Sequence, residues 1–193
     1  MEIAIIKYNA GNVLSVINAL HRLGIEPVLT DDPEKLKKAD KVIFPGVGEA
    51  SSAMNYLKMR NLDKVIKELS QPFLGICLGL QLMCRHSEEN DTECLGIFDL
   101  GVKKFPPKDK VPHIGWNRLD ITESPLFRGA GTNTFLYFVH SYYAETGTGT
   151  IATTEYIVPF SAALNRGNYF AVQAHPEKSG KDGERILKNF ISL

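Results

Sequence analysis

The chain has 193 residues, a length that fits one or two ordinary domains, and we predict a single domain over residues 1–193. Hydrophobic residues make up 44% and charged residues 23%, so the chain can bury a sizeable core and is not a disordered or low-complexity polypeptide. Lys plus Arg and Asp plus Glu both number 22, and this formal net charge of +0 gives no reason to expect nucleic acid or an anionic membrane as a partner.

The sequence also gives no sign of a membrane segment or a secretory leader. No stretch approaches the roughly 18 consecutive apolar residues that a membrane helix needs, and residues 1–7 lack a basic leader with a cleavage site. The three cysteines, Cys77, Cys84 and Cys94, form neither an even disulfide set nor a Cys-x-x-Cys pair, which is typical of a reducing compartment. We therefore expect a cytoplasmic protein.

The first half of the chain alternates between strand and helix patterns. Short β-branched apolar runs predict strands over residues 2–8, 26–30, 41–44 and 72–76. Helical spacing of apolar residues predicts helices over residues 13–23, 33–39, 50–60 and 62–69. Strands that alternate with helices imply right-handed crossovers and a parallel sheet covered on both faces.

The second half is richer in β structure. Short β-type runs cover residues 111–118, 134–140, 143–146, 150–156, 161–165 and 169–174. Helical periodicity returns only at the end, where one apolar face contains Ile186, Leu187, Phe190 and Ile191. The predicted fold class is therefore three-layer α/β, with a mostly parallel central sheet, helices on both faces and a β-rich second half.

The segment over residues 72–81 runs from an apolar strand into a helix, with Cys77 at the corner. A sharp strand-to-helix turn strains its central residue and needs small neighbours, here Gly75 and Gly79, so that the backbone does not clash. The turn projects the sulfur out of the sheet at a helix N-terminus, which favours thiolate over thiol. Taken alone, the segment fits a nucleophile elbow and a buried inert cysteine equally well.

A histidine suited to act as the base for Cys77 follows another strand-like run. His175 stands before Pro176, and a residue before proline is pushed into extended geometry. Residues two apart in extended chain share a face, so Glu177 is expected to orient the imidazole while the other ring nitrogen faces the sulfur. Cys77, His175 and Glu177 are thus the predicted nucleophile, base and orienting carboxylate.

A thiolate that attacks a carbonyl creates an oxyanion, which needs preorganised donors. The candidates are the backbone amide of Leu78 and that of Gly46 or Val47, in the glycine-rich turn over residues 45–48. Spacing does not decide between the last two. The turn taken alone is a simple strand exit, but both segments follow parallel strands, and ligands bind at the carboxyl ends of such strands.

The remaining histidines are not spaced for a metal site, so we expect structural roles for them and neither a metal nor a cofactor. They are His21, His86, His113 and His140. Cys84 and Cys94 are expected to be inert buried residues.

The motifs over residues 45–48, 75–81 and 175–177 make the chain resemble class I (triad) glutamine amidotransferases over nearly its whole length. Within that family, the chain is similar to the glutaminase subunits of imidazole glycerol phosphate synthases. The narrower resemblance rests on four further segments, YNAGN (8–12), PHIGWN (112–117), YFVHSY (137–142) and HPEKS (175–179).

The resemblance implies a flavodoxin-like fold and an enzyme that hydrolyses glutamine. Cys77 would attack the side-chain amide, ammonia would leave, and water would convert the γ-glutamyl thioester into glutamate, with His175 carrying the protons. The positions that match the family's glutamine-binding residues are Gln81, Glu89, Ser141 and Tyr142. Without the motif, Gln81 and Glu89 would be taken for exposed polar residues of a helix.

The resemblance also implies a partner. Ammonia would pass to a separate (β/α)8-barrel cyclase subunit, which converts the phosphoribulosyl intermediate PRFAR into imidazole glycerol phosphate and AICAR in a heterodimeric, lyase-type complex of histidine biosynthesis. The positions that match the family's interface are Asn12, Trp116, Tyr137 and Lys178. From the residues alone, Trp116 fits a core position as well as an interface anchor.

Three alternatives stay open at this level. The chain could be a glutaminase that serves another acceptor, such as anthranilate or vitamin B6 (pyridoxal phosphate) synthesis, although the segments around Asn12 and Trp116 argue against it. It could be a cysteine hydrolase that acts on γ-glutamyl or peptide substrates. A non-enzymatic binding module of the same fold is disfavoured, because all three predicted triad residues are present.

Overall fold

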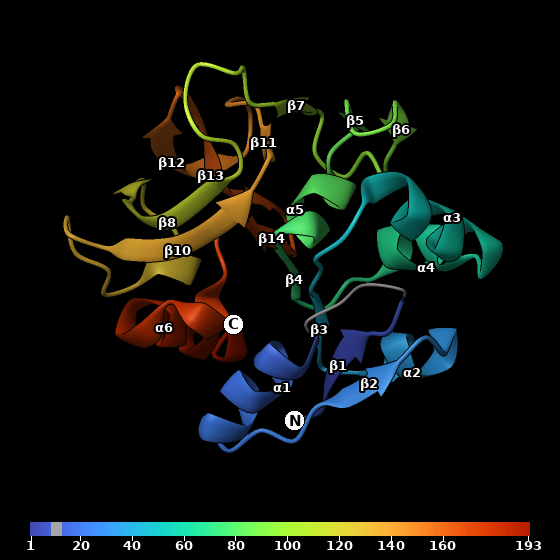
Figure 1. Cartoon of the computed structure of the whole chain (residues 1–193). Helices are drawn as coiled ribbons and strands as arrows, with labels where there is room; N and C mark the ends of the chain where they lie inside the picture. The colour runs from blue at the N-terminus through green and yellow to red at the C-terminus, as the bar shows by residue number, and fades with distance from the viewer. Residues whose placement is uncertain (9–12) are drawn as a thin grey trace.

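The structure, a computed structural model, describes residues 1–8 and 13–193, and its first half alternates strands and helices (Figure 1). In chain order these elements are β1 (Ile3–Ile6), α1 (Val13–Arg22), β2 (Val28–Thr30), α2 (Pro33–Lys38), β3 (Lys41–Phe44), α3 (Ala50–Met59), α4 (Leu62–Glu68), β4 (Phe73–Ile76) and α5 (Leu78–Met83). Apart from α5, for which no bounds were predicted, each element ends within two residues of its prediction.

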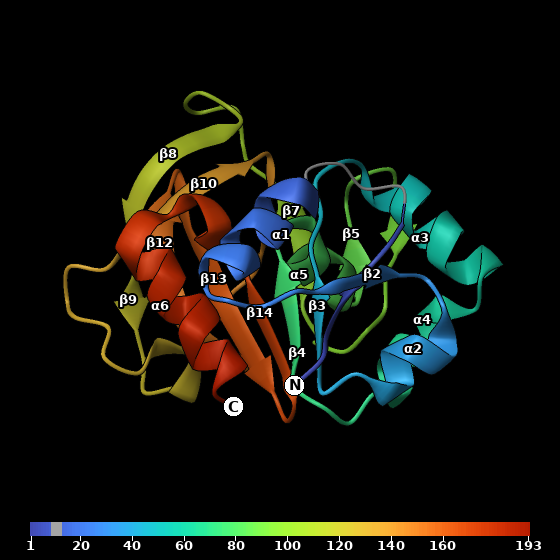
Figure 2. The same ribbon diagram turned by 90° about the horizontal axis from the view of Figure 1, so that it is seen from below.

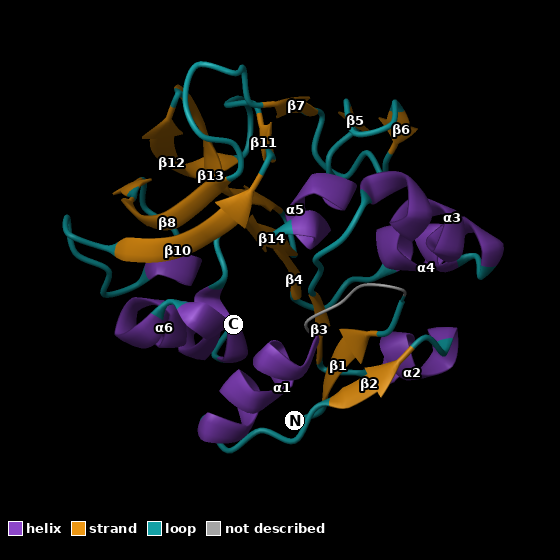
Figure 3. Cartoon of the chain, in the orientation of Figure 1, coloured by secondary structure: helices purple, strands orange, loops and turns teal. Residues whose placement is uncertain are grey.

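Strands dominate the second half, as Figure 3 shows in orange. The elements are β5 (His86–Ser87), β6 (Thr92–Glu93), β7 (Gly101–Lys104), β8 (His113–Arg118), β9 (Asp120–Ile121), η1 (Pro125–Phe127), β10 (Phe135–His140), β11 (Tyr142–Ala144), β12 (Thr150–Tyr156), β13 (Val158–Arg166), β14 (Tyr169–Val172), η2 (Pro176–Lys178) and α6 (Gly180–Ile191). The sequence analysis missed β5, β6, β7 and β9, as well as the two 3-10 turns η1 and η2.

The central sheet has eight strands in the order β2-β1-β3-β4-β14-β13-β12-β9. Neighbouring strands are parallel from β2 through β14 and antiparallel from β14 to β9. A two-stranded sheet of β8 and β10 and a four-stranded sheet of β11, β7, β5 and β6 lie beside it. The predicted fold class is confirmed, because a mainly parallel sheet carries the α/β half and antiparallel strands extend it.

Successive residues of a strand point to opposite faces of the sheet, and in the parallel strands the residues on both faces are apolar. Helices therefore cover both faces of the central sheet. Ile3 and Ile5 of β1 pack in one cluster with residues of α1 and α6, and these two helices lie on the near side of the sheet in Figure 2. Ala4 and Ile6 pack in a second cluster with residues of α2, α3, α4 and α5. All four β1 residues are fully buried, which explains why the strand is a continuous apolar run.

The sheet order brings the carboxyl ends of three neighbouring strands together. Phe44 of β3 is in register with Gly75 of β4, and Ile76 of β4 is in register with Val172 of β14. The chain leaves these strands into the turn over residues 45–48, into Cys77 and into the segment that leads to His175. These segments are far apart in the sequence and meet at one edge, where open α/β sheets bind ligands.

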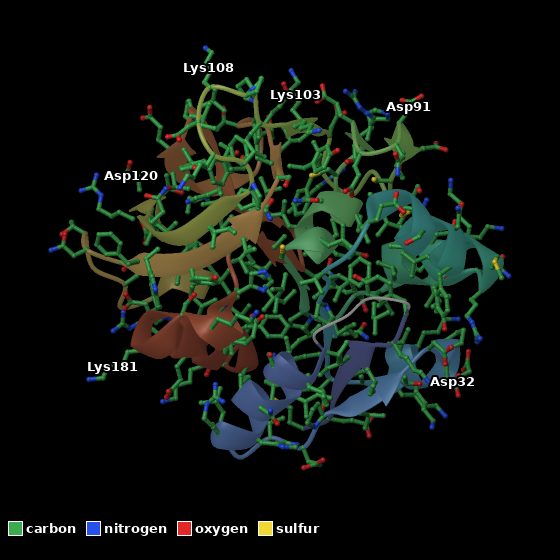
Figure 4. All side chains as sticks on the ribbon, viewed as in Figure 1. Asp32, Asp91, Lys103, Lys108, Asp120 and Lys181 are labelled. Carbon is green, nitrogen blue, oxygen red and sulfur yellow. The ribbon has the colours of Figure 1, made fainter. Side chains whose placement is uncertain are left out.

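Charged side chains gather at the periphery of the molecule. The six residues labelled in Figure 4 are exposed and point outward from both halves of the chain: Asp32, Asp91, Lys103, Lys108, Asp120 and Lys181. None of the helices over the described residues is long and apolar enough to cross a membrane.

Candidate active site

Cys77 occupies a strained corner between β4 and α5, with φ 53° and ψ −106°. A positive φ is costly for a residue with a side chain and clusters at functional sites. The Cys77 N–H donates to the Val172 carbonyl (2.8 Å), which ties the corner to β14. A methyl group at Gly79 would clash with the Phe44 carbonyl, and one at Gly75 would lie 3.0 Å from the Gly79 backbone. Both glycines are therefore needed for the close packing that the sequence predicts.

His175 and Glu177 form the hydrogen-bonded pair that the sequence predicts, but the backbone that joins them is not extended as predicted. His175 Nδ1 lies 2.8 Å from Glu177 Oε1, and the two side chains are only 2% and 1% exposed. His175 has an extended backbone, but Glu177 lies in the 3-10 turn η2, so the two side chains meet across a turn and not along a strand. The carboxylate accepts a hydrogen bond from the Nδ1–H group, which leaves Nε2 as the ring nitrogen available for proton exchange.

The imidazole of His175 is strongly affected by its two neighbours. Burial lowers the pKa of His175, but hydrogen bonding to Cys77 and Glu177 and their negative charges outweigh it and raise the pKa to about 10. Nε2 is buried and makes no well-aligned hydrogen bond within residues 1–8 and 13–193, although the Cys77 sulfur lies within interaction range. Such bonds often tighten only when substrate is present. At neutral pH, the His175 imidazole is therefore protonated.

Cys77 opens into a cavity of 270 Å³, close to the lower end of the roughly 300–1,000 Å³ typical of ligand pockets. The predicted site residues that line it are Val47, Cys77, Leu78, Gln81, Glu89, Ser141 and Tyr142. Gly46, His175 and Glu177 line a smaller void that shares Val47 with the cavity. The structure thus brings the candidate nucleophile, base, oxyanion donors and glutamine-binding residues to one place.

Gln81 is buried in α5 and is not the exposed helix residue that composition alone would suggest. Its Nε2 donates to the Tyr142 carbonyl (2.9 Å) and to Gln173 Oε1 (3.1 Å). Gln173 is fully buried, and its Nε2 lies 3.7 Å from the Cys77 sulfur. The sequence analysis missed Gln173, for which the available signal was a lone amide in the apolar run over residues 170–174.

Glu89 lies in a turn and is half-buried in the wall of the cavity. Its Oε2 accepts a hydrogen bond from the Ala50 N–H (2.8 Å) at the start of α3. Burial raises the pKa of Glu89, the Ala50 N–H opposes this effect, and the nearby Glu49 carboxylate adds to it. Glu89 therefore places a partly desolvated carboxylate in the wall of the cavity.

One of the candidate oxyanion donors, the Leu78 amide, is not free to bind an oxyanion in this structure. The Leu78 N–H donates to the Gly46 carbonyl (3.2 Å), so the amide beside the nucleophile is already hydrogen-bonded. The Gly46 carbonyl, and not an amide of the same turn, faces Leu78. For Leu78 and Val47 to donate to an oxyanion together, the peptide between Gly46 and Val47 would have to rotate.

Three of the candidate interface residues lie next to the His175 segment. Trp116 is 55% exposed, so the alternative of a core position is wrong. Its ring packs on that of half-buried Tyr137, with centroids 6.1 Å apart. The Tyr137 carbonyl accepts a hydrogen bond from the His175 N–H (2.9 Å), and Lys178 is exposed in η2. The fourth candidate, Asn12, lies outside the described residues.

The other histidines have structural settings. His113 Nδ1 and His140 Nε2 are 3.2 Å apart, and His140 Nδ1 donates to the Tyr142 carbonyl (2.7 Å). Burial lowers the pKa of His113 to about 4 and that of His140 to about 3, so both rings stay neutral. His21 and His86 pair with surface carboxylates. Over residues 1–8 and 13–193, no cluster of three or more His, Cys, Asp or Glu residues is arranged to hold a metal ion.

Comparison with known proteins assigns this geometry to a family. The family model described as glutamine amidotransferase class-I matches residues 5–193. The chain belongs to the class I glutamine amidotransferases. Among solved structures, a glutamine amidotransferase shares the fold with a TM-score of 0.76 at 19% identity, covering 98% of this chain and 97% of that one. The PurLQS structure from Thermotoga maritima has a TM-score of 0.73 at 16% identity, covering 99% of this chain and 97% of that one.

Several relatives of this amidotransferase carry a more specific name. A Bacteroides fragilis (strain YCH46) protein named imidazole glycerol phosphate synthase subunit HisH is 59% identical over the full length of both chains. Proteins of the same name from Blochmanniella floridana and Vibrio cholerae are 44% and 43% identical, covering all of this chain and 100% and 98% of the relatives. The resemblance found from the motifs is thereby confirmed.

Proposed function

We propose that this amidotransferase is the glutaminase subunit of an imidazole glycerol phosphate synthase and acts as one domain over residues 1–193. The observation that carries the proposal is the Cys77 sulfur at a 270 Å³ cavity beside an imidazole that Glu177 orients. The full-length identity of 59% to a protein named HisH supports this acceptor over anthranilate or pyridoxal phosphate synthesis. The cytoplasmic location stays a prediction.

In the first half-reaction, the Cys77 sulfur attacks the side-chain amide carbon of glutamine and a C–S bond forms. The carbonyl electrons move onto oxygen, and this oxyanion needs the amides of Leu78 and of the turn over residues 45–48. His175, protonated because its pKa is raised to about 10, gives its Nε2 proton to the amide nitrogen. The C–N bond breaks, and ammonia leaves the γ-glutamyl thioester.

In the second half-reaction, water attacks the thioester carbonyl and gives a proton to His175 Nε2. The C–S bond breaks, glutamate leaves, and the thiolate and imidazolium are restored. Glu177 holds the ring in one orientation through both steps and balances its positive charge, because Oε1 lies 2.8 Å from Nδ1. The net reaction is glutamine plus water to glutamate plus ammonia.

The polar residues that line the cavity suit the amino-acid end of glutamine. The Glu89 carboxylate can pair with the α-ammonium group. Ser141 and Tyr142 line the same cavity, and their backbone N–H groups would bind the α-carboxylate. Two hydrogen bonds fix the Tyr142 carbonyl, from Gln81 and from His140. This wall is therefore rigid before glutamine binds.

The outer face of β8 and β10 supports a partner. Ile114, Trp116 and Phe135 are 61%, 55% and 42% exposed, and large apolar side chains gathered on one surface are typical of an interaction site. We infer that the (β/α)8-barrel cyclase docks on this face. Docking there would enclose the site and keep ammonia from being protonated in bulk water.

The test is to replace Cys77 by Ala and to assay the chain with a barrel cyclase and PRFAR. We expect glutamine-dependent synthesis of imidazole glycerol phosphate to disappear while synthesis from added ammonium continues. Cys94→Ala removes another buried thiol and should retain both activities. Glutamine-dependent turnover in the Cys77 variant would contradict the nucleophile assignment. A glutaminase without any effect of the cyclase would favour the γ-glutamyl hydrolase alternative.

A further inference from the structure

The hydroxyl of Tyr8 holds the turn that closes the oxyanion site. Tyr8 is 6% exposed, and its Oη donates to the Pro45 carbonyl at 2.7 Å. Its ring packs on Phe44 with centroids 5.2 Å apart. Phe44 is the last residue of β3, so the ring is anchored on the strand while the hydroxyl reaches the turn that follows it.

Gly46 is in close contact with Tyr8 and with Leu78. A methyl group on its Cα would clash with the Tyr8 hydroxyl and would lie 3.0 Å from Leu78 Cβ. The Gly46 carbonyl accepts the Leu78 N–H at 3.2 Å. The Tyr8 hydroxyl therefore fixes the peptide plane that precedes Gly46, and Leu78 holds the plane that follows it. Rotation of the second plane needs freedom at Gly46, which the contact with Tyr8 restricts.

Tyr8 does not take part in the proton transfers of the proposed reaction. Burial, and then the negative charge of Cys77, raise the pKa of Tyr8 far above its usual value, so the phenol keeps its proton and can only donate. Its Oη donates a hydrogen bond to a backbone carbonyl of the turn. Among the described residues that line the substrate cavity, Tyr8 is absent. Its hydrogen bond links it instead to the turn that carries Gly46.

We propose that Tyr8 is a positioning residue that holds the Pro45–Gly46 turn in its closed form and so keeps glutamine hydrolysis slow until the partner docks. The inference rests on the proposed function. In the sequence, Tyr8 directly precedes residues 9–12, which include the predicted interface residue Asn12. A partner that contacts Asn12 would act on a segment only four residues from the hydroxyl that holds the turn.

The chain offers a matched control at the other end of one aromatic row. The rings of Tyr8, Phe44, Phe73 and Tyr169 form a row of tilted contacts, with centroid distances of 5.2, 6.0 and 5.5 Å. The Tyr169 hydroxyl also donates to backbone carbonyls, those of Ile66 (2.8 Å) and Leu69 (3.0 Å). Tyr169→Phe therefore removes the same kind of hydrogen bond from the same row, away from the turn.

The experiment compares the glutaminase kinetics of wild type, Tyr8→Phe and Tyr169→Phe, each alone and with the ligand-bound cyclase. In Tyr8→Phe we expect the kcat without partner to rise about five- to tenfold, as loss of one hydrogen bond allows. The KM for glutamine should stay constant, and the stimulation by the cyclase should shrink by the same factor. Tyr169→Phe should match wild type. Hydrogen exchange at the Leu78 amide should be faster only in Tyr8→Phe.

A kcat of Tyr8→Phe without partner at or below that of wild type overturns the inference. Thermal unfolding is measured for each variant, and Tyr8→Leu, which also lacks the hydroxyl, replaces Tyr8→Phe if that variant does not fold. A wild-type chain that stays inactive even with the cyclase overturns the proposed function and the inference with it. If the cyclase stimulates the wild type but Tyr8→Phe behaves like Tyr169→Phe, the role of Tyr8 is overturned and the proposed function stands.

Discussion

The two carboxylate oxygens of Glu177 have different surroundings, and this difference matters for catalysis. Oε1 lies 2.8 Å from His175 Nδ1, whereas Oε2 is buried and has no hydrogen-bond partner among the residues that the structure describes. A buried carboxylate with an unpaired oxygen is costly, and the adjacent imidazolium is the charge that offsets that cost. The pair is thus coupled, since removing the charge of Glu177 also removes a group that raises the pKa of His175.

Glu177→Gln should shift the alkaline limb of the glutaminase pH profile to lower pH. The imidazolium is the form that protonates the leaving nitrogen, so activity falls as pH rises through the His175 pKa of about 10. The neutral amide cannot stabilise the imidazolium as the carboxylate does, and the pKa must therefore fall. We also expect kcat to drop by about 10²- to 10⁴-fold. Profiles of kcat/KM against pH test this, with exposed Glu93→Gln as the control, and an unchanged alkaline limb would contradict it.

Some site residues could be predicted from local pattern and others could not. Cys77 stands between two glycines in a strand-to-helix segment, and His175 and Glu177 flank a proline, so short motifs indicate all three. Gln173 and Tyr8 act through atoms that only the assembled sheet brings near them, namely the Cys77 sulfur and the Pro45 carbonyl. No local spacing encodes such contacts.

The junction of β4 and α5 depends on how closely α5 approaches β3. Gly79 lies in the first turn of α5 with its Cα against the Phe44 carbonyl, so there is no room for a side chain between helix and strand. This contact holds Cys77 beside the turn over residues 45–48. The packing of two elements therefore sets the position of the nucleophile.

Gly79→Ala should lower the free energy of unfolding by about 1–3 kcal/mol, because the added methyl group meets rigid backbone and must push α5 away from β3. The matched control is Gly131→Ala, where a methyl group would meet nothing within 4 Å. That variant should stay within about 0.5 kcal/mol of wild type. Urea unfolding of both variants measures the difference. Equal stabilities would show that α5 can shift freely.

Most strands of three or more residues were predictable, with the four-residue β7 as the exception, whereas the two-residue strands were not. β3 carries four buried residues, and its predicted bounds are those of the structure. β5, β6 and β9 have two residues each, too few for any alternation of apolar and polar residues to be visible. The turn η2 was missed because Pro176 argued for extended chain, whereas proline also fits the first position of a helical turn.

The β8–β10 sheet connects an exposed surface to the edge of the central sheet that carries the catalytic residues. Trp116 and Tyr137 are directly opposite each other in the antiparallel pair. The Tyr137 carbonyl accepts a hydrogen bond from the His175 N–H, and the Tyr137 N–H donates to Ser179 Oγ (both 2.9 Å). A partner that binds the outer face would therefore press on a strand that is hydrogen-bonded to the segment carrying His175 and Glu177.

Trp116→Ala should weaken binding of the cyclase by about 2 kcal/mol or more, roughly 30-fold in Kd, because a large exposed aromatic ring at an interface is a typical hot spot. The isolated chain should unfold at the same temperature as wild type, since the ring is 55% exposed and adds little to the core. Met59→Ala is the matched control, because Met59 is 82% exposed at the end of α3, an element remote from β8 and β10 in Figure 1. Titration calorimetry with the cyclase separates the two variants. Equal affinities for both would place the cyclase on another face, and glutamine hydrolysis would then have to be coupled to docking by a route that does not pass through Tyr137.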